Sequence, residues 1–139
     1  YFLRDCKREA DRLGLPFGDI SDPLGRPTER GLAVLHHAIQ KGCGPEFLVS
    51  FLKGAWAEGL DGGSDTGLKT MAKRAGMSTE DVKTALADES WREAAEIHRS
   101  RLMSYGLWGV PSFKIGDTAI WGQGRLWQVE QALSLASQR

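Results

Sequence analysis

Residues 106–113 read GLWGVPSF and residues 121–126 read WGQGRL, and these two motifs decide the fold. Pro111 stands directly before a run of strand-forming residues, where a proline cannot donate a hydrogen bond to a sheet. After a glycine-rich turn, a cis bond before proline is a common solution, although trans bonds are commoner overall. Residue chemistry alone therefore leaves both isomers open. A cis bond would turn the backbone of Val110 outward, with its N–H and C=O free to bind an extended peptide.

The residues between the two motifs predict a β-hairpin. Two β-like runs, 112–115 and 118–121, flank Gly116-Asp117, and a glycine followed by one residue is the signature of a two-residue type II′ turn. This register gives the hairpin one mainly apolar face. It pairs Phe113 with Ile120 and Ile115 with Thr118.

Apolar residues elsewhere recur at helical spacing. Thr28 is a candidate cap for the second helix, and Pro45 suits the first turn of the third. Ser78 to Asp81 and Ser90 to Glu93 match the spacing of capping boxes. The predicted helices span residues 1–14, 29–41, 45–58, 65–75, 79–88, 91–105 and 125–137, and residues 15–27 are a predicted loop.

Three of these helices have well-defined apolar stripes, which we expect to be buried. The stripes comprise Leu32, Leu35, Ala38 and Ile39 in the second helix, Phe47, Leu48, Phe51, Leu52, Ala55 and Trp56 in the third, and Leu126, Val129 and Leu133 in the last.

Strand content is low for a sequence with a hairpin. Eight predicted strand residues make up roughly 6% of the chain, well below the usual share. An isolated hairpin is marginally stable and normally belongs to a larger sheet. We therefore expect that the rest of the sheet is missing from the chain. The sequence also begins at Tyr1 without a Met, so we expect that processing, proteolysis or deliberate truncation removed its true start.

Composition indicates one soluble globular domain. The chain has 139 residues, 18 Lys and Arg against 18 Asp and Glu, and 41% hydrophobic residues. This balance excludes a disordered chain and gives no bulk attraction to nucleic acid or anionic lipid. Two cysteines are too few for a disulfide-built scaffold, and no apolar run is long enough for a membrane helix.

Residues 68–82 also resemble a repressor-type helix-turn-helix. Residues 64–90 carry four Lys and Arg against five Asp and Glu, and the recognition helix would begin Ser-Thr-Glu-Asp. Those carboxylates would face phosphates, so the electrostatic pattern of DNA binding is lacking. We therefore predict no nucleic-acid partner.

Four other groups of residues favour structural over chemical roles. His36 and His37 are adjacent and point about 100° apart on a helix, so they cannot chelate a metal together. Cys6 and Cys43 are expected to be free thiols. Gly122-x-Gly124 is too short for a dinucleotide fingerprint. The five tryptophans could line a pocket for an aromatic substrate, but core or interface positions are favoured for each. They are Trp56, Trp91, Trp108, Trp121 and Trp127.

The order of the motifs resembles the 2-hydroxychromene-2-carboxylate isomerase and kappa-class glutathione transferase family, which belongs to the DsbA-like group of thioredoxin folds. The most specific matches are residues 109–113, the hairpin, residues 121–126 and the final helix. Weaker matches follow in the family's order, so the resemblance covers essentially the whole chain. They are Tyr1, Asp5, Arg8 and Ala10, then LGLP at 13–16 and WAEGLD at 56–61.

The resemblance implies an α/β thioredoxin-like fold with a mostly helical insertion. Residues 1–105 would form the inserted helical domain, and residues 106–139 the C-terminal β-β-α half of the thioredoxin domain. The N-terminal β-α-β half would be lacking. That half carries the family's catalytic Ser, or a Cys-x-x-Cys in DsbA-like relatives. No residue of this chain matches either, so no catalytic residue and no metal ligand is assigned.

The resemblance also implies a binding site for glutathione. Val110 would pair through its backbone with the cysteinyl unit, and Pro111 would be the family's cis-proline. Gln123 and Gly124 would hold the γ-glutamyl group at the N-terminus of the last helix, where free N–H groups and positive potential suit a carboxylate. Gly124 departs from the family, which usually has Asp there to hold the γ-glutamyl ammonium.

Three functions follow as hypotheses. The first is a cytoplasmic glutathione-dependent isomerase or transferase that acts on small aromatic electrophiles and can form a homodimer. The second is a DsbA-like thiol–disulfide oxidoreductase, and the third is a non-catalytic helical interaction module. In the first two, we expect the chain as given to be inactive by itself, because its nucleophile would be missing. No membrane partner is expected.

Overall fold

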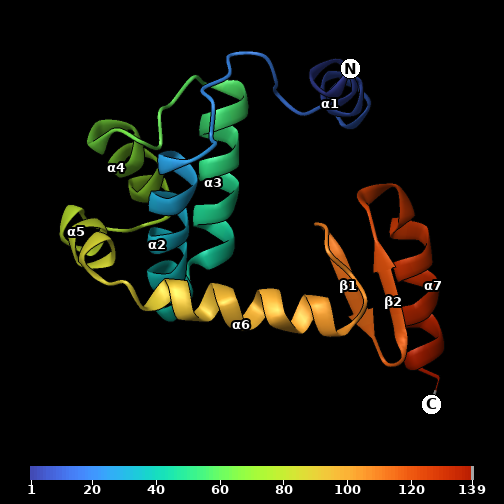
Figure 1. Cartoon of the computed structure of the whole chain (residues 1–139). Coiled ribbons are helices and arrows are strands. Elements are labelled where there is room, and N and C mark those ends of the chain that lie inside the picture. Colours follow the sequence, from blue (N-terminus) through green and yellow to red (C-terminus); the bar gives the residue numbers. More distant parts are fainter. Residues whose placement is uncertain (139) are drawn as a thin grey trace. The chain divides into compact units, whose positions relative to one another are not determined.

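The computed structural model describes residues 1–138 and divides into two compact units, Tyr1–Trp91 and the part from Arg92 onward (Figure 1). The predicted division between residues 105 and 106 stays a prediction. In chain order the elements are α1 (Phe2–Leu13), α2 (Arg26–Gln40), α3 (Gly44–Ala57), α4 (Asp65–Arg74), α5 (Thr79–Ala87), α6 (Ser90–Ser104), β1 (Ser112–Ile115), β2 (Thr118–Trp121), the 3-10 turn η1 (Gln123–Arg125) and α7 (Leu126–Ala136).

Helices α2 to α5 pack around the core of the first unit. The Ser50 hydroxyl, which is buried there, donates a hydrogen bond of 2.9 Å to the Met71 carbonyl. That bond satisfies a polar group that would otherwise be costly to bury. The largest fully buried side chains are Phe47, Leu68, Met71, Val34 and Val82.

The buried face of α2 overlaps the predicted stripe only in part. Ala38 is buried and Leu35 packs against the core, as predicted, whereas Leu32 and Ile39 are exposed and Ala33 and Val34 are buried instead. The cause is a close approach between helices: a Cβ on Gly31 would lie 2.8 Å from the Phe51 ring of α3. Small residues allow this approach, so the core contacts the side of α2 that carries Gly31, Val34 and Ala38, and not Leu32 and Ile39.

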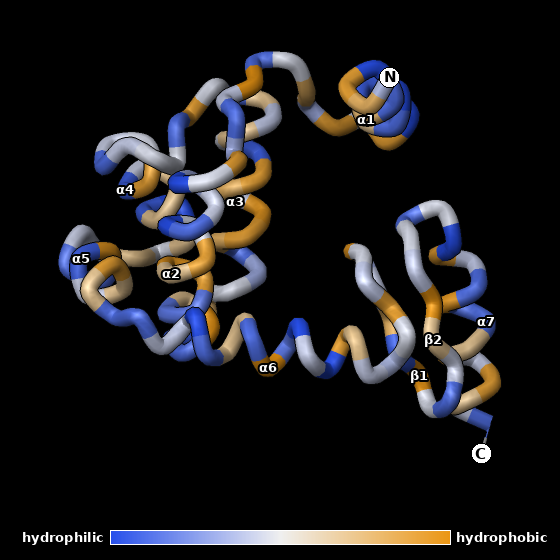
Figure 2. The backbone as a smooth tube through the Cα atoms, viewed as in Figure 1, coloured by the Kyte–Doolittle hydropathy of each residue, from blue (hydrophilic) through white to orange (hydrophobic). Residues whose placement is uncertain are grey.

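Two further predicted stripes are only partly buried. In α3 the core contains Phe47, Phe51 and Ala55, whereas Leu48 and Leu52 are exposed. Figure 2 shows α3 as apolar along much of its length, which agrees with apolar residues on more than one face. In α7 Val129 is buried, but Leu126 and Leu133 are exposed.

The helix starts show which caps the sequence predicts correctly. The Ser78–Asp81 capping box of α5 is confirmed. Helix α2 begins at Arg26, so Thr28 lies inside it and its hydroxyl donates to the Pro23 carbonyl. At the start of α6, Ser90 bonds to Asp88 and not to Glu93 as the predicted capping box requires. The Asp88 carboxylate accepts hydrogen bonds from the N–H and the hydroxyl of Ser90.

The second unit contains the predicted hairpin. Strands β1 and β2 are antiparallel, and Phe113 pairs with Ile120 and Ile115 with Thr118, which confirms the register. A type II′ turn requires a positive φ at its first central residue and a negative φ at its second. Gly116 has φ +53°, and Asp117, like every described non-glycine residue, has no positive φ. Helix α7 packs against both strands. Within residues 1–138, no helix has the length and apolar character needed to cross a bilayer.

Candidate functional site

The Val110–Pro111 junction connects an exposed backbone to the hairpin. The peptide bond is cis, as the resemblance implies. Val110 is 83% exposed, and within residues 1–138 neither its N–H nor its C=O has a hydrogen-bond partner. Pro111, by contrast, accepts a hydrogen bond of 2.9 Å from the N–H of Gly122. Pairing at Pro111 therefore ties this junction to the turn after β2, while the Val110 backbone stays available.

The turn after β2 places Gln123 and Gly124 next to that hydrogen bond. Both residues are exposed and lie in η1, because the α-helix begins only at Leu126 and not at the predicted residue 125. In the described chain, their backbone N–H groups have no acceptor. Two free N–H groups at the start of a helical segment can bind a carboxylate.

Gly124 leaves room for a side chain. A Cβ built on this residue has no other atom within 4 Å, and its φ is not positive. The position therefore has space for a side-chain carboxylate, which this chain does not supply. The residues present fit the carboxylate of a γ-glutamyl group better than its ammonium.

Two tryptophans lie beside the junction. The rings of Trp108 and Trp121 are 5.7 Å apart between centroids and tilted by 44°. Trp108 is 73% exposed, and the indole of Trp121 covers Gly109 so closely that a Cβ there would lie 2.4 Å from its Nε1. Trp108 is thus not a core residue.

A small basic pocket of about 130 Å³ lies between the end of α6 and β1. The Lys114 ammonium lies 5.4 Å from the centroid of the Tyr105 ring, a cation–π distance. His98 and Arg101 line the same pocket. Sequence reasoning did not find this group, because it combines residues of a helix with residues of a strand.

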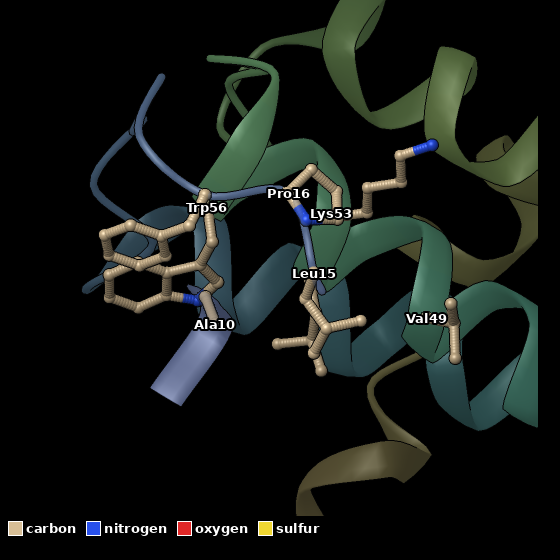
Figure 3. A pocket seen from close by; sticks show the side chains of 8 residues that line it. Ala10, Leu15, Pro16, Val49, Lys53 and Trp56 are labelled. Carbon is tan, nitrogen blue, oxygen red and sulfur yellow. The ribbon is translucent and has the colours of Figure 1, made fainter. Parts of the chain in front are cut away.

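A larger apolar pocket of about 490 Å³ lies in the first unit, and we call it the α1–α3 pocket (Figure 3). Figure 3 shows Ala10 and Trp56 at one end and Val49 at the other, with Leu15 between them. The pocket is lined by Ala10, Leu15, Pro16, Phe17, Val49, Leu52, Lys53 and Trp56. Of the five tryptophans, Trp56 is therefore the one that lines this pocket.

The two cysteines and the adjacent histidines lie in the first unit. Cys6 and Cys43 are free thiols, which confirms that prediction. His36 Nε2 lies within hydrogen-bond distance of Gln40 and Ser90, and His37 Nε2 lies 3.6 Å from Asp81. Among the described residues, no three His, Cys, Asp or Glu side chains cluster as metal ligands.

Comparison with known proteins gives one family and one fold. A solved structure of 2-hydroxychromene-2-carboxylate isomerase matches with a TM-score of 0.73 and 20% sequence identity, over 96% of this chain and 64% of that one. The chain therefore spans less than two thirds of that structure, and the match shows a shared fold. No curated protein matches the chain. The family model described as a DSBA-like thioredoxin domain matches residues 1–134, and the chain belongs to this family.

Proposed function

We propose that this chain forms the peptide-binding part of a glutathione-dependent isomerase or transferase that acts on small aromatic electrophiles. The observation that carries the proposal is the free backbone of Val110 beside the free N–H groups of Gln123 and Gly124. Pro111 and Gly122 are joined by a hydrogen bond. Val110 directly precedes Pro111 and Gln123 directly follows Gly122, so this bond holds the two residues near each other. An extended peptide with a terminal carboxylate fits such an arrangement.

Glutathione, when bound, would supply a thiol whose thiolate form is nucleophilic. The residues of this chain would orient it. The N–H and C=O of Val110 would pair with the cysteinyl backbone, and the N–H groups of Gln123 and Gly124 would bind the γ-glutamyl carboxylate. The group that faces the sulfur is left unassigned.

Titration calorimetry with glutathione tests the Val110 contact. Val110→Ala keeps the backbone N–H and should change the dissociation constant by less than about twofold, because the side chain is exposed. Val110→Pro removes the N–H and should weaken binding by roughly tenfold. Circular dichroism and the melting temperature establish that both variants are folded. Equal affinities for the two folded variants would contradict the proposed contact.

Gly124→Asp tests the γ-glutamyl contact in the opposite direction. The new carboxylate has room and can bind the ammonium, so we expect glutathione to bind about threefold to tenfold more tightly. Gly124→Asn is the matched control, with nearly the same shape but no charge. If the Asp variant binds no more tightly than the Asn variant, the γ-glutamyl group does not lie at Gly124.

A thiol–disulfide oxidoreductase is the second candidate, because the family model describes a DSBA-like domain. In that case Pro111 would face a Cys-x-x-Cys pair. The two cysteines of this chain, Cys6 and Cys43, do not have that spacing. Titration calorimetry separates the candidates without requiring turnover: tighter binding of glutathione than of an extended tripeptide with no γ-glutamyl group favours the first proposal, and equal or tighter binding of that tripeptide favours the oxidoreductase.

A further inference from the structure

Helix α3 has apolar side chains on two faces. Phe47, Phe51 and Ala55 are buried in the core of the first unit. Val49 and Leu52 lie on another face, are 66% and 46% exposed, and line the α1–α3 pocket. A surface helix of a globular domain usually has one apolar face. The second apolar face therefore requires an explanation beyond the packing of the core.

Backbone hydrogen bonds hold the opposite wall of the pocket in place. The N–H of Leu15 donates to the Ala10 carbonyl at 2.8 Å, which closes the end of α1. The N–H of Gly18 donates to the Trp56 carbonyl at 3.0 Å and that of Ser21 to the Ala55 carbonyl at 2.8 Å. The loop that carries Leu15, Pro16 and Phe17 is thus fastened to the end of α3. Hydrogen bonds of the backbone therefore define this wall of the pocket.

Aromatic rings make up one end of the pocket. Phe17 and Trp56 are stacked with centroids 6.2 Å apart and planes 11° apart, and Phe2 meets Trp56 edge-on at 6.3 Å. Rings fixed in this way lose little freedom when another ring packs against them. Aromatic pairs also contribute beyond their buried area. This end therefore favours a flat aromatic ligand.

The lining has no uncompensated charge. Lys53 contributes its aliphatic chain, and Figure 3 shows its amine directed away from Trp56. That amine lies 3.4 Å from a carboxylate oxygen of Glu58. An anionic ligand would have to compete with Glu58 for it. A cationic ligand would find no carboxylate among the lining residues and would be repelled by the Lys53 ammonium. Charge complementarity therefore selects an uncharged ligand.

We propose that the α1–α3 pocket is a binding site for a compact, uncharged aromatic molecule, which packs against Trp56 and Phe17 and covers Val49 and Leu52. The volume of about 490 Å³ falls within the range of small-molecule sites in proteins. The inference goes beyond the proposed function and does not rest on it. Binding of an aromatic molecule here requires nothing from Val110, Gln123 or Gly124.

A matched pair of variants on α3 tests the site. Leu52→Trp fills the pocket, whereas Leu48→Trp places the same ring at a residue of similar exposure, 43% against 46%, that does not line it. Titration calorimetry of the full chain with 2-naphthol should give saturable binding with a negative heat-capacity change. Leu52→Trp should weaken it by roughly tenfold or more, and Leu48→Trp by less than about twofold. No saturable binding, or equal effects of the two variants, overturns the proposal.

Two further measurements sharpen the test. Binding of 2-naphthoate, which has the same rings and a negative charge, should be weaker than that of 2-naphthol by roughly threefold or more. Equal or tighter binding of the anion overturns the assignment of an uncharged ligand. Analytical ultracentrifugation tests whether this face is instead an interface between two copies of the chain. If the wild type self-associates and Leu52→Trp abolishes the self-association while Leu48→Trp does not, the pocket is such an interface and the proposal is overturned.

Parallel titrations with glutathione separate this inference from the proposed function. If 2-naphthol binds with the expected Leu52 dependence and glutathione does not bind, the pocket stands and the proposed function fails. If glutathione binds with the expected Val110 dependence and 2-naphthol does not bind, the pocket proposal fails by itself.

Discussion

Asp81 connects two helices of the first unit through a single carboxylate. One oxygen accepts hydrogen bonds of 2.8 and 2.9 Å from the N–H and hydroxyl of Ser78, and the other lies 2.7 Å from the Lys41 ammonium. Lys41 first, and then Ser78, lower the pKa of Asp81 well below its usual range. The charged form is therefore stabilised by folding.

This shift predicts a pH-dependent contribution to stability. Because the folded pKa lies below the unfolded value of about 3.9, the contribution is present at neutral pH and is lost as the pH falls below about 4. Asp81→Asn removes it. Urea unfolding should therefore show a larger difference between wild type and variant at pH 6 than at pH 3.

Asp11→Asn is the control for this experiment. Asp11 pairs with Lys7 on the exposed surface of α1, where an ion pair contributes little. This variant should match the wild type closely at both pH values. A difference for Asp81→Asn that stays constant from pH 6 to pH 3 would show that its carboxylate does not stabilise the fold through its charge.

The first turn of helix α4 packs closely against the loop that precedes it. Gly67 lies in its first turn, and its N–H donates to the capping hydroxyl of Ser64 at 3.0 Å. A Cβ on Gly67 would lie 2.1 Å from the backbone oxygen of Asp61. Backbone atoms cannot move aside as the end of a side chain can, so this position requires glycine for space.

Gly67→Ala sets helix propensity against sterics. Alanine is favoured over glycine inside a helix by about 1 kcal/mol. Overpacking typically costs about 1–3 kcal/mol, and here the contact is with fixed backbone. We expect a net loss of stability in urea unfolding, whereas Gly124→Ala, which meets no atom, should be nearly neutral or slightly stabilising. A Gly67→Ala variant at least as stable as wild type would contradict the close approach.

Local signals explain which elements the sequence predicts well. The structure confirms the predicted hairpin and the predicted Ser78 cap. Both could be predicted because they depend only on residues close together in the sequence. The buried face of α2 depends on the distance to another helix. Its predicted stripe and its buried stripe share Ala38 and have the same period, and the approach of Phe51 to Gly31 determines which residues beside Ala38 are buried. Periodicity alone cannot supply that information.

Buried apolar side chains are distributed unequally between the two units. The first unit has a continuous core, including Val34, Phe47 and Leu68. From Arg92 to Gln138, the buried hydrophobic side chains are Ile120 and Val129. Because local stability follows buried contact, the hairpin should open more readily than the helical core.

Hydrogen exchange followed by mass spectrometry measures this difference. Peptides that contain β1 and β2 should exchange roughly tenfold faster or more than peptides from the interiors of α2, α3 and α4. Unfolded chain in denaturant supplies the intrinsic rates for both regions. Equal protection of hairpin and core would show that the chain opens as one cooperative unit.

The candidate site illustrates what a sequence can contribute at the scale of the molecule. Val110, Gln123 and Gly124 could be named from sequence because their motifs resemble those of a known family. The α1–α3 pocket was missed because its walls come from residues 10–17 and 49–56, which folding brings together. One signal was present in the sequence: α3 has more apolar residues than a single buried face can hold.

The two-stranded sheet bears on how this protein behaves at high concentration. Strand edges with unpaired N–H and C=O groups can pair with other chains and seed intermolecular sheets. Each strand here is only four residues long, β1 carries Lys114, and Pro111 directly before it has no N–H to donate. Short length, a charge and a proline all disfavour growth of an amyloid-like ladder. The hairpin thus carries its own protection against polymerisation.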